Sequence, residues 1–212
     1  MRNYQKELDQ IIQCCREAGR VPRLLLHSCC APCSSYVLEY LSQYFRITDF
    51  FYNPNITEEA EYRKRTEEMR TLIRLQPHLY EVEFIEGRYE PGRFFEAAKG
   101  LETCREGGAR CEQCFRLRLM ETALKAAAGH ADPGGGPPEP YDFFTTTLTI
   151  SPLKNAELLN RIGEESETYS GGVKWLPCDF KKKGGFQRSV ELSSAYNLYR
   201  QNYCGCIFSR SS

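Results

Sequence analysis

Residues 24–36 read LLLHSCCAPCSSY, and the fold of the chain is organised around this stretch. The apolar run Leu24–Leu26 is typical of a short buried strand. Ser34 and Ser35 are residue types that cap helices, and the apolar Val37 begins a helical pattern behind them. The stretch therefore predicts a strand, a turn and a helix, which is the repeating unit of α/β proteins.

Three cysteines lie in this turn, Cys29, Cys30 and Cys33. Open α/β sheets usually bind ligands outside the carboxyl ends of their strands, where this turn is expected to lie. The N-terminus of a helix also carries positive potential, which lowers the pKa of a thiol and favours the thiolate. We therefore interpret the turn as half of a metal or redox site.

Strands and helices alternate along the rest of the chain. The other predicted strands are 47–52, 80–85, 142–148 and 173–176. The other predicted helices are 4–15, 58–75, 91–98, 111–124, 155–167 and 187–203. This alternation predicts an α/β fold with a mostly parallel sheet between helices, a three-layer architecture that is Rossmann-like or HUP-like. We expect one domain over 1–212, with a flexible Pro/Gly-rich loop at 131–140.

Composition narrows the class of protein. The chain has 212 residues, of which 41% are hydrophobic and 26% charged, as in globular rather than disordered proteins. Its formal net charge is zero, so nucleic-acid binding would need a local basic patch. No apolar run reaches the roughly 20 residues that span a bilayer, and the polar N-terminus does not resemble a signal peptide. We therefore expect a cytoplasmic protein with no membrane partner.

The eleven cysteines are clustered rather than spread as in a disulfide framework. Cytoplasmic thiols are kept reduced, so clustering favours metal binding first and catalysis second. Cys29 and Cys30, together with the C-x-x-C pair Cys111 and Cys114, supply four thiolates from two loops. Four thiolates suit tetrahedral zinc or an iron–sulfur cluster. Adjacent side chains point apart, which favours a cluster, because its iron corners are separated in space.

Cys33 has no obvious place in that set of four. It is a candidate for an alternative corner ligand, for a ligand to a second metal, or for a packed thiol. Asp179 is the nearest candidate oxygen ligand for a second ion. Equally, Asp179 is a surface carboxylate that pairs with the lysines at 181–183.

The C-terminal segment contains Cys204-Gly205-Cys206. Two residues span at most about 7 Å, and a bend at Gly205 brings the two thiols within disulfide range. A strained ring of this size is readily reduced, which fits an electron relay. Two free thiols at a frayed end of the chain are the alternative.

Two further predictions concern protons and phosphates. His27 is a candidate proton donor, although a histidine at a strand end is about as often structural. The basic residues that we expect to contact phosphates are Lys181, Lys182, Lys183 and Arg188. A basic run of this length is not by itself specific to nucleic-acid binding.

The ordered motifs resemble those of the QueH type of epoxyqueuosine reductase, from Leu24 to Ser209. The shared motifs are LLLHSCCAPC, FYNPNI, EYRKR, RCEQCFRLRL, FTTTLTISPLK, DFKKKGG, RSVEL, YNLYRQNYCGC and FS. The resemblance implies a cytoplasmic oxidoreductase that reduces epoxyqueuosine to queuosine at the wobble position of tRNA. This is the final step of queuosine biosynthesis. The partners that it implies are that tRNA and an unidentified electron donor.

The same resemblance implies roles for individual residues. It implies a 4Fe-4S cluster on Cys29, Cys30, Cys111 and Cys114. It implies a redox-active pair at Cys204 and Cys206. An iron ion beside the cluster, held by cysteine and aspartate, would correspond to Cys33 and Asp179.

Two other functions compete with this interpretation. An ATP-dependent tRNA-modifying enzyme of the PP-loop type shares the strand–loop–helix layout, but it cradles phosphate in a glycine-rich turn. Residues 28–35 contain no glycine, which counts against ATP use. A non-catalytic zinc module that binds RNA is the second competitor, and metal analysis separates it from a cluster enzyme.

Overall fold

The computed structural model of the protein describes residues 2–130 and 137–210. Within these residues the centre is a five-stranded, all-parallel sheet in the order β3-β2-β1-β4-β5. The strands are β1 Arg23–Ser28, β2 Arg46–Phe51, β3 Val82–Glu86, β4 Phe143–Thr146 and β5 Lys174–Trp175. The predicted parallel sheet is confirmed. The predicted loop at 131–140 lies mostly outside the described residues.

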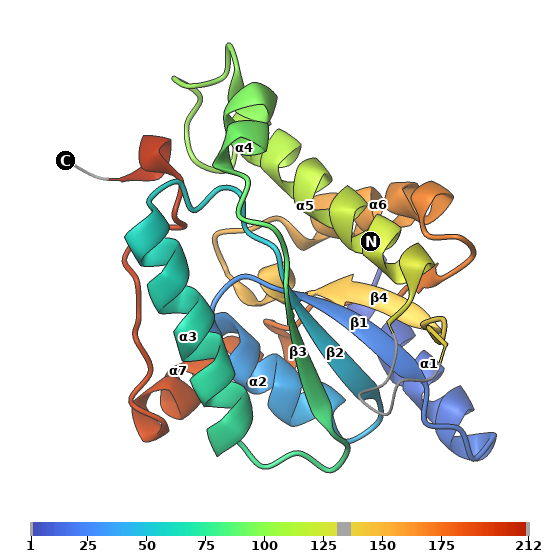
Figure 1. Ribbon diagram of the computed structural model, residues 1–212. Coiled ribbons are helices and arrows are strands. Elements are labelled where there is room, and N and C mark those ends of the chain that lie inside the picture. The colour runs from blue at the N-terminus through green and yellow to red at the C-terminus, as the bar shows by residue number, and fades with distance from the viewer. Residues whose placement is uncertain (1, 131–136, 211–212) are drawn as a thin grey trace.

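Helices cover both faces of the sheet, which gives the molecule three layers (Figure 1). On one side lie α2 (Ala31–Leu41), α3 (Glu59–Leu75) and α7 (Gly185–Ala195), and on the other α5 (Ala109–Ala128) and α6 (Ala156–Ser166). The remaining helices are α1 (Tyr4–Glu17), next to α2, and α4 (Pro91–Ala98), against α5. Four short 3₁₀ turns are η1 (Thr147–Ile150), η2 (Glu167–Tyr169), η3 (Lys182–Gly184) and η4 (Ile207–Ser209). The predicted three-layer α/β class is confirmed.

The central strand β1 is the most deeply buried part of the sheet. Leu24, Leu25 and Leu26 are fully buried between the two helical layers, and removal of this apolar surface from water stabilises the fold. β1 pairs with β2 on one side and with β4 on the other. The strand order reverses between β1 and β4, which is where open α/β sheets bind ligands. The cysteine turn follows β1 at this point.

The helix after the turn begins earlier than the serines predicted. Cys30 is the N-cap residue of α2, and Pro32 stands in its first turn, where a missing N–H costs nothing. Ser34 and Ser35 lie inside the helix, and their hydroxyls donate to the carbonyls of Cys30 and Pro32. The predicted capping by these serines is therefore wrong, and Cys33 belongs to the first turn of α2.

Two predicted elements, the last helix and the fourth strand, were too long. α7 ends at Ala195 rather than at residue 203, and Asn197 has φ +51°, a left-handed conformation that no helix continues through. β4 ends at Thr146, where the side chain of this residue accepts from Leu148 N and starts the 3₁₀ turn η1. Both ends are set by local backbone turns that apolar periodicity does not report.

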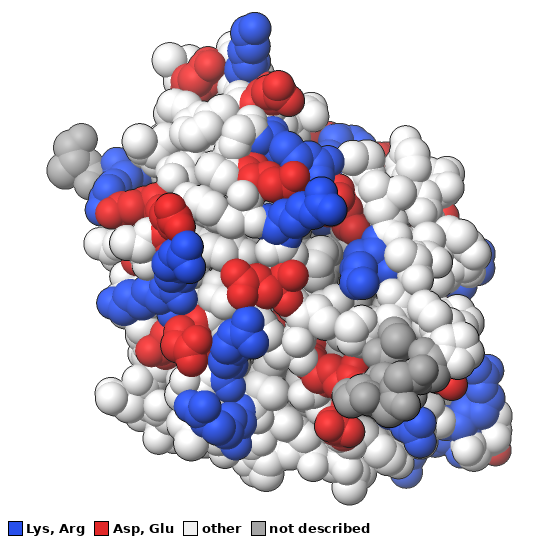
Figure 2. All heavy atoms as spheres, in the orientation of Figure 1, with Lys and Arg blue, Asp and Glu red and all other residues white. Residues whose placement is uncertain are grey.

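The surface carries mixed charge. Figure 2 shows basic and acidic side chains interspersed over the face that contains α3. On that helix Arg63 pairs with Glu59, and Arg70 pairs with Glu86 of β3. Among the described residues, no helix is long and apolar enough to cross a membrane.

Candidate metal and redox site

The turn after β1 brings three thiols together. The Sγ atoms of Cys29, Cys30 and Cys33 all lie within 4.8 Å of one another, and those of Cys29 and Cys30 are 3.8 Å apart. Cys30 is buried, while Cys29 and Cys33 are partly buried. The three thiols can hold a metal ion, because soft thiolates at this spacing are metal ligands. Cys33, which had no assigned partner in the sequence, belongs to this group.

One thiolate is favoured within this group. The thiols of Cys30 and Cys33 donate to Cys29, which holds the pKa of Cys29 well below its usual value, and Lys154 and Arg118 add positive charge. The same hydrogen bond raises the pKa of Cys30 to about 12, and that of Cys33 is raised as well. A metal that binds here would replace the remaining two protons.

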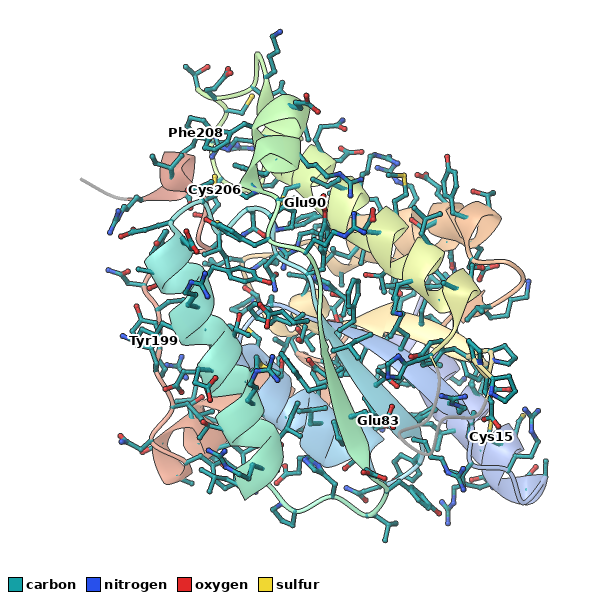
Figure 3. All side chains as sticks on the ribbon, viewed as in Figure 1. Cys15, Glu83, Glu90, Tyr199, Cys206 and Phe208 are labelled. Carbon is teal, nitrogen blue, oxygen red and sulfur yellow. The ribbon has the colours of Figure 1, made fainter. Side chains whose placement is uncertain are left out.

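A second group of thiols lines a cavity of about 100 Å³ near the N-terminus of α5. Cys111 and Cys114 face it from α5, and Cys204 and Cys206 face it from the C-terminal segment. Figure 3 shows Cys206 and Phe208 close to α4 and α5, whereas Cys15 lies far away on α1. Burial raises the pKa of Cys114 to about 11 and also raises that of Cys111. Both are neutral thiols until a metal or a cation favours the thiolate.

Two cations connect the two thiol groups. Arg118 and Lys154 line the cavity and also act electrostatically on Cys29. Cys29, Cys33 and Cys204 raise the pKa of Lys154, against the opposite effect of burial. The thiols of the turn and those of the cavity therefore belong to one electrostatic site.

The cavity is unusually cationic. Arg110, Arg118 and Lys154 lie on its wall, and Glu106 is the acidic residue among its described lining residues. Arg110 is 2% exposed and donates to the carbonyl groups of residues 101, 102 and 104. None of the three cations forms an ion pair with a carboxylate in the described part of the chain. The cavity is therefore suited to an anionic occupant.

The Cys204–Cys206 segment is held in place by buried polar side chains. Arg65 donates to the carbonyls of Tyr203 and Cys204, and Asn55 donates to the same carbonyl of Cys204. Gly205 has φ +101°, and a Cβ there would lie 2.7 Å from the Ile56 side chain. This segment is thus a tightly fitted turn rather than a frayed end, and the sequence analysis missed the contribution of Arg65.

His27 is not placed to donate protons. Its ring is fully buried, and burial together with Arg118 lowers its pKa to about 3. Its Nδ1 lies 2.7 Å from Thr146 Oγ1, and its Nε2 accepts from Arg118 Nε at 3.3 Å. The neutral ring joins β1, β4 and α5, so the structural interpretation of His27 is the one that the contacts favour.

Asp179 and the predicted phosphate-binding residues lie outside the cavity that the cysteines line. Asp179 Oδ1 pairs with Lys181 Nζ at 2.5 Å, and its side chain lines a separate cavity beside α1. It is not among the metal-competent group of described residues at the turn. Lys183 pairs with Asp9, and Arg188 pairs with Glu39. Lys182 alone of the predicted phosphate contacts has no carboxylate partner within the described residues.

Fold and site together define a Rossmann-like α/β protein with a thiolate centre at the switch point of its sheet. Residues 24–212 match the family described as epoxyqueuosine reductase QueH. The chain is similar to the epoxyqueuosine reductase QueH of Staphylococcus epidermidis, at 43% identity over 97% of this chain and 84% of that protein. It is 36% identical to the protein of the same name from Thermotoga maritima, over 88% of this chain and 89% of that protein.

The chain therefore belongs to the QueH family of epoxyqueuosine reductases, which are oxidoreductases. The predicted family and the predicted enzyme class are confirmed. The ligand sets stay predictions.

Proposed function

We propose that the protein reduces the epoxide of epoxyqueuosine at the wobble position of tRNA, giving queuosine in the final step of queuosine biosynthesis. The observation that carries this proposal is the family match over residues 24–212. The reaction consumes two electrons and two protons, removes the epoxide oxygen as water and leaves a carbon–carbon double bond. The site must therefore store electrons, deliver protons and exclude bulk water.

We assign a 4Fe-4S cluster to Cys29, Cys30, Cys111 and Cys114. Two features of these residues suit an iron–sulfur cluster. All four are thiols, the ligands that iron–sulfur clusters use. Arg118 and Lys154 line the cavity with Cys111 and Cys114, act electrostatically on Cys29 and have no carboxylate partner among the described residues, so they can balance the negative charge of a thiolate-bound cluster. When bound, such a cluster supplies electrons one at a time.

Cys204 and Cys206 are proposed as the pair that stores two electrons. Oxidation of two thiols to a disulfide releases two electrons and two protons, which balances reduction of one epoxide to an alkene and water. The tether formed by Arg65 and Asn55 holds this pair at the cavity. An external reductant of the dithiol class then restores the thiols.

Lys154 is the cation best placed to act on the substrate oxygen. It lies on the cavity wall with Cys204, and the nearby thiolates keep it protonated. A protonated amine can donate a hydrogen bond to an epoxide oxygen and stabilise the negative charge that develops when the bond breaks. His27, neutral and enclosed, does not supply this proton.

For the tRNA, we propose phosphate contacts from Lys181, Lys182, Lys183 and Arg188. Lys182 is the best candidate for a phosphate contact, because Lys181, Lys183 and Arg188 already pair with acidic side chains. The assignment of Cys33 and Asp179 to an adjacent iron stays a prediction, since Asp179 pairs with Lys181, and we derive no step from it.

One observation favours a zinc ion over an iron–sulfur cluster. Tetrahedral zinc with Zn–S bonds of about 2.3 Å places its sulfurs about 3.8 Å apart. That is the separation of the Cys29 and Cys30 Sγ atoms. A mononuclear zinc site on the turn would replace the cluster proposed above. Metal and sulfide analysis of anaerobically purified protein distinguishes the two.

The test of the proposed function is an anaerobic assay with tRNA that contains epoxyqueuosine and a strong one-electron donor. Cluster-loaded protein is expected to form queuosine, and C204S and C206S are expected to lose turnover with a thiol reductant. Cys15→Ser is the matched control, because Cys15 lies far from the cavity (Figure 3). Absence of queuosine with a loaded sample refutes the activity. Zinc without labile sulfide refutes the cluster.

A further inference from the structure

Arg118 is a buried arginine in the centre of the molecule. The residue is only 3% exposed. It extends from α5 toward the carboxyl end of β1, where its Nε donates to His27 Nε2 at 3.3 Å. Its Nη2 donates to Asn53 Oδ1, in the turn after β2. Neither of these acceptors is a carboxylate.

The charge of Arg118 has no carboxylate partner in the described residues. A buried arginine usually pairs with a carboxylate, as Arg65 does: it is about equally buried and lies 2.7 Å from Glu61. An unpaired buried charge costs several kcal/mol, because the water that would solvate it has been removed. Arg118 is therefore placed to balance an anion other than the carboxylates of the described residues.

The groups near Arg118 that become negative when a metal binds are cysteine sulfurs. Cys114 stands four residues earlier on α5, so it projects from the same face of the helix, and both side chains line the same cavity. Cys29 follows the Arg118 acceptor His27 by two residues and experiences the same charge. The guanidinium thus lies on the same cavity wall as the thiols of α5 and acts electrostatically on Cys29 of the turn.

Arg118 also connects, through hydrogen bonds, the turn after β2 with the end of β1. Asn53, which accepts from Arg118, donates through Nδ2 to the carbonyl of Ser28 at 2.9 Å. Ser28 directly precedes Cys29, and His27 precedes Ser28. A single side chain of α5 therefore fixes the backbone on which Cys29 and Cys30 stand.

We propose that Arg118 is the built-in counter-ion of the thiolate metal centre, a positioning residue whose fixed positive charge sets the reduction potential and the metal affinity of that centre. Positive charge stabilises the more negative, reduced state, so it raises the reduction potential. The part of this inference that concerns redox chemistry rests on the proposed function. The part that concerns metal affinity requires only that the thiols bind a metal.

The first test is the midpoint potential of the cluster-loaded protein, measured without substrate. R118Q keeps hydrogen-bond donors but removes the charge, and it should shift the reduction equilibrium at least about tenfold toward the oxidised state, which is 59 mV for one electron. R118K keeps the charge and should stay within about threefold of the wild type. R116Q is the control, because Arg116 lies on the same helix but pairs with Glu165 at the surface.

A second variant covers the case in which R118Q does not fold. Asn53→Asp leaves Arg118 in place and gives it a carboxylate partner at the position of the present acceptor. Because the new carboxylate cancels the charge, N53D should lower the potential as R118Q does, while its metal-free form should remain folded. A potential unchanged in both R118Q and N53D overturns the proposal. So does an R118K potential that falls as far as that of R118Q, because geometry rather than charge would then be decisive.

The second test uses Co²⁺ as the probe and metal-free protein. Thiolate-to-cobalt absorption reports binding, and the affinity of R118Q and of N53D should be at least about tenfold weaker than that of wild type and R118K. If the protein holds no reducible cluster, the proposed function fails, whereas this measurement still tests Arg118. Equal Co²⁺ affinity in wild type, R118Q and N53D overturns the counter-ion role.

Discussion

Cys204 and Cys206 have different surroundings although a single glycine separates them. Cys204 is half-buried, and its Sγ lies 3.0 Å from the hydroxyl of Ser209. The thiol of Cys206 and this hydroxyl donate to Cys204 and lower its pKa to about 6, against the effect of burial. Cys206 is buried, and the negative charge beside it raises its pKa above the usual value. Cys204 is therefore the nucleophilic member of the pair.

This asymmetry predicts selective alkylation of reduced, metal-free protein. Iodoacetamide should modify Cys204 at pH 7, at a rate that falls as the pH decreases through about 6, because the thiolate becomes protonated. Peptide mass spectrometry identifies the modified site. C206A should move this midpoint upward, whereas C206S retains a donor and should move it less. A wild-type midpoint near 8.5, that of an ordinary thiol, contradicts the prediction.

At the scale of elements, a glycine sets the distance between α6 and the sheet. A Cβ on Gly163 would lie 2.3 Å from the ring of Trp175 on β5, so the helix approaches closely only because that atom is absent. Asn160 on α6 accepts from Trp175 Nε1 and from Cys178 N. Small side chains on α6 thus position the end of β5 and the start of the segment that carries Asp179.

G163A should therefore destabilise the protein by about 1–3 kcal/mol, because the added methyl group forces α6 away from Trp175. Gly92 is the matched control, since it lies in α4 and a Cβ there meets nothing within 4 Å. G92A should be neutral or stabilising by up to about 1 kcal/mol. Urea unfolding measures both variants. Equal stability of G163A and wild type would contradict the packing described for α6.

On the scale of the whole molecule, a carboxyl group in the middle of the sheet makes stability depend on pH. Asp49 of β2 is fully buried, and its Oδ1 accepts from Ser28 Oγ at 2.6 Å. Its Oδ2 has no hydrogen-bond partner within residues 2–130 and 137–210. Burial raises the pKa of Asp49 to about 8. Between about pH 4 and 8 the folded protein therefore keeps a proton that the unfolded chain releases.

The stability contributed by Asp49 is thus complete below about pH 4 and is lost as the pH rises to about 8, by at most about 1.4 kcal/mol per pH unit. D49N should remove this component, so the difference in unfolding free energy between wild type and variant should change steadily from pH 4 to 8. Urea unfolding at several pH values measures it. D9N is the control, because Asp9 pairs with Lys183 and its pKa is lowered. A constant difference for D49N would show that Asp49 is ionised in the folded state.

Local patterns in the sequence were enough to predict the architecture of this protein. The alternation of strands and helices, the apolar run at Leu24–Leu26 and the clustered thiols depend on neighbours within a few residues, so periodicity and spacing report them. Element ends were less predictable. The end of α7 depends on a left-handed Asn197, and the start of α2 on Cys30 rather than on the serines.

The partners of polar side chains were set by packing in three dimensions. Arg118 meets His27, 91 residues away along the chain, and Arg65 meets Tyr203 across 138 residues. Cys33 joins Cys29 and Cys30, and Asp179 pairs with Lys181, although the spacing of residues allowed other choices. No local pattern contains the contacts of Arg118 and Arg65, because hydrogen bonds form between whichever groups folding buries together. The contacts of Cys33 and Asp179 are local, and the sequence left each of them open among several alternatives. The thiols could be recognised from the sequence, whereas the cations near them, which lack a carboxylate partner in the described part of the chain, could be recognised only in the folded protein.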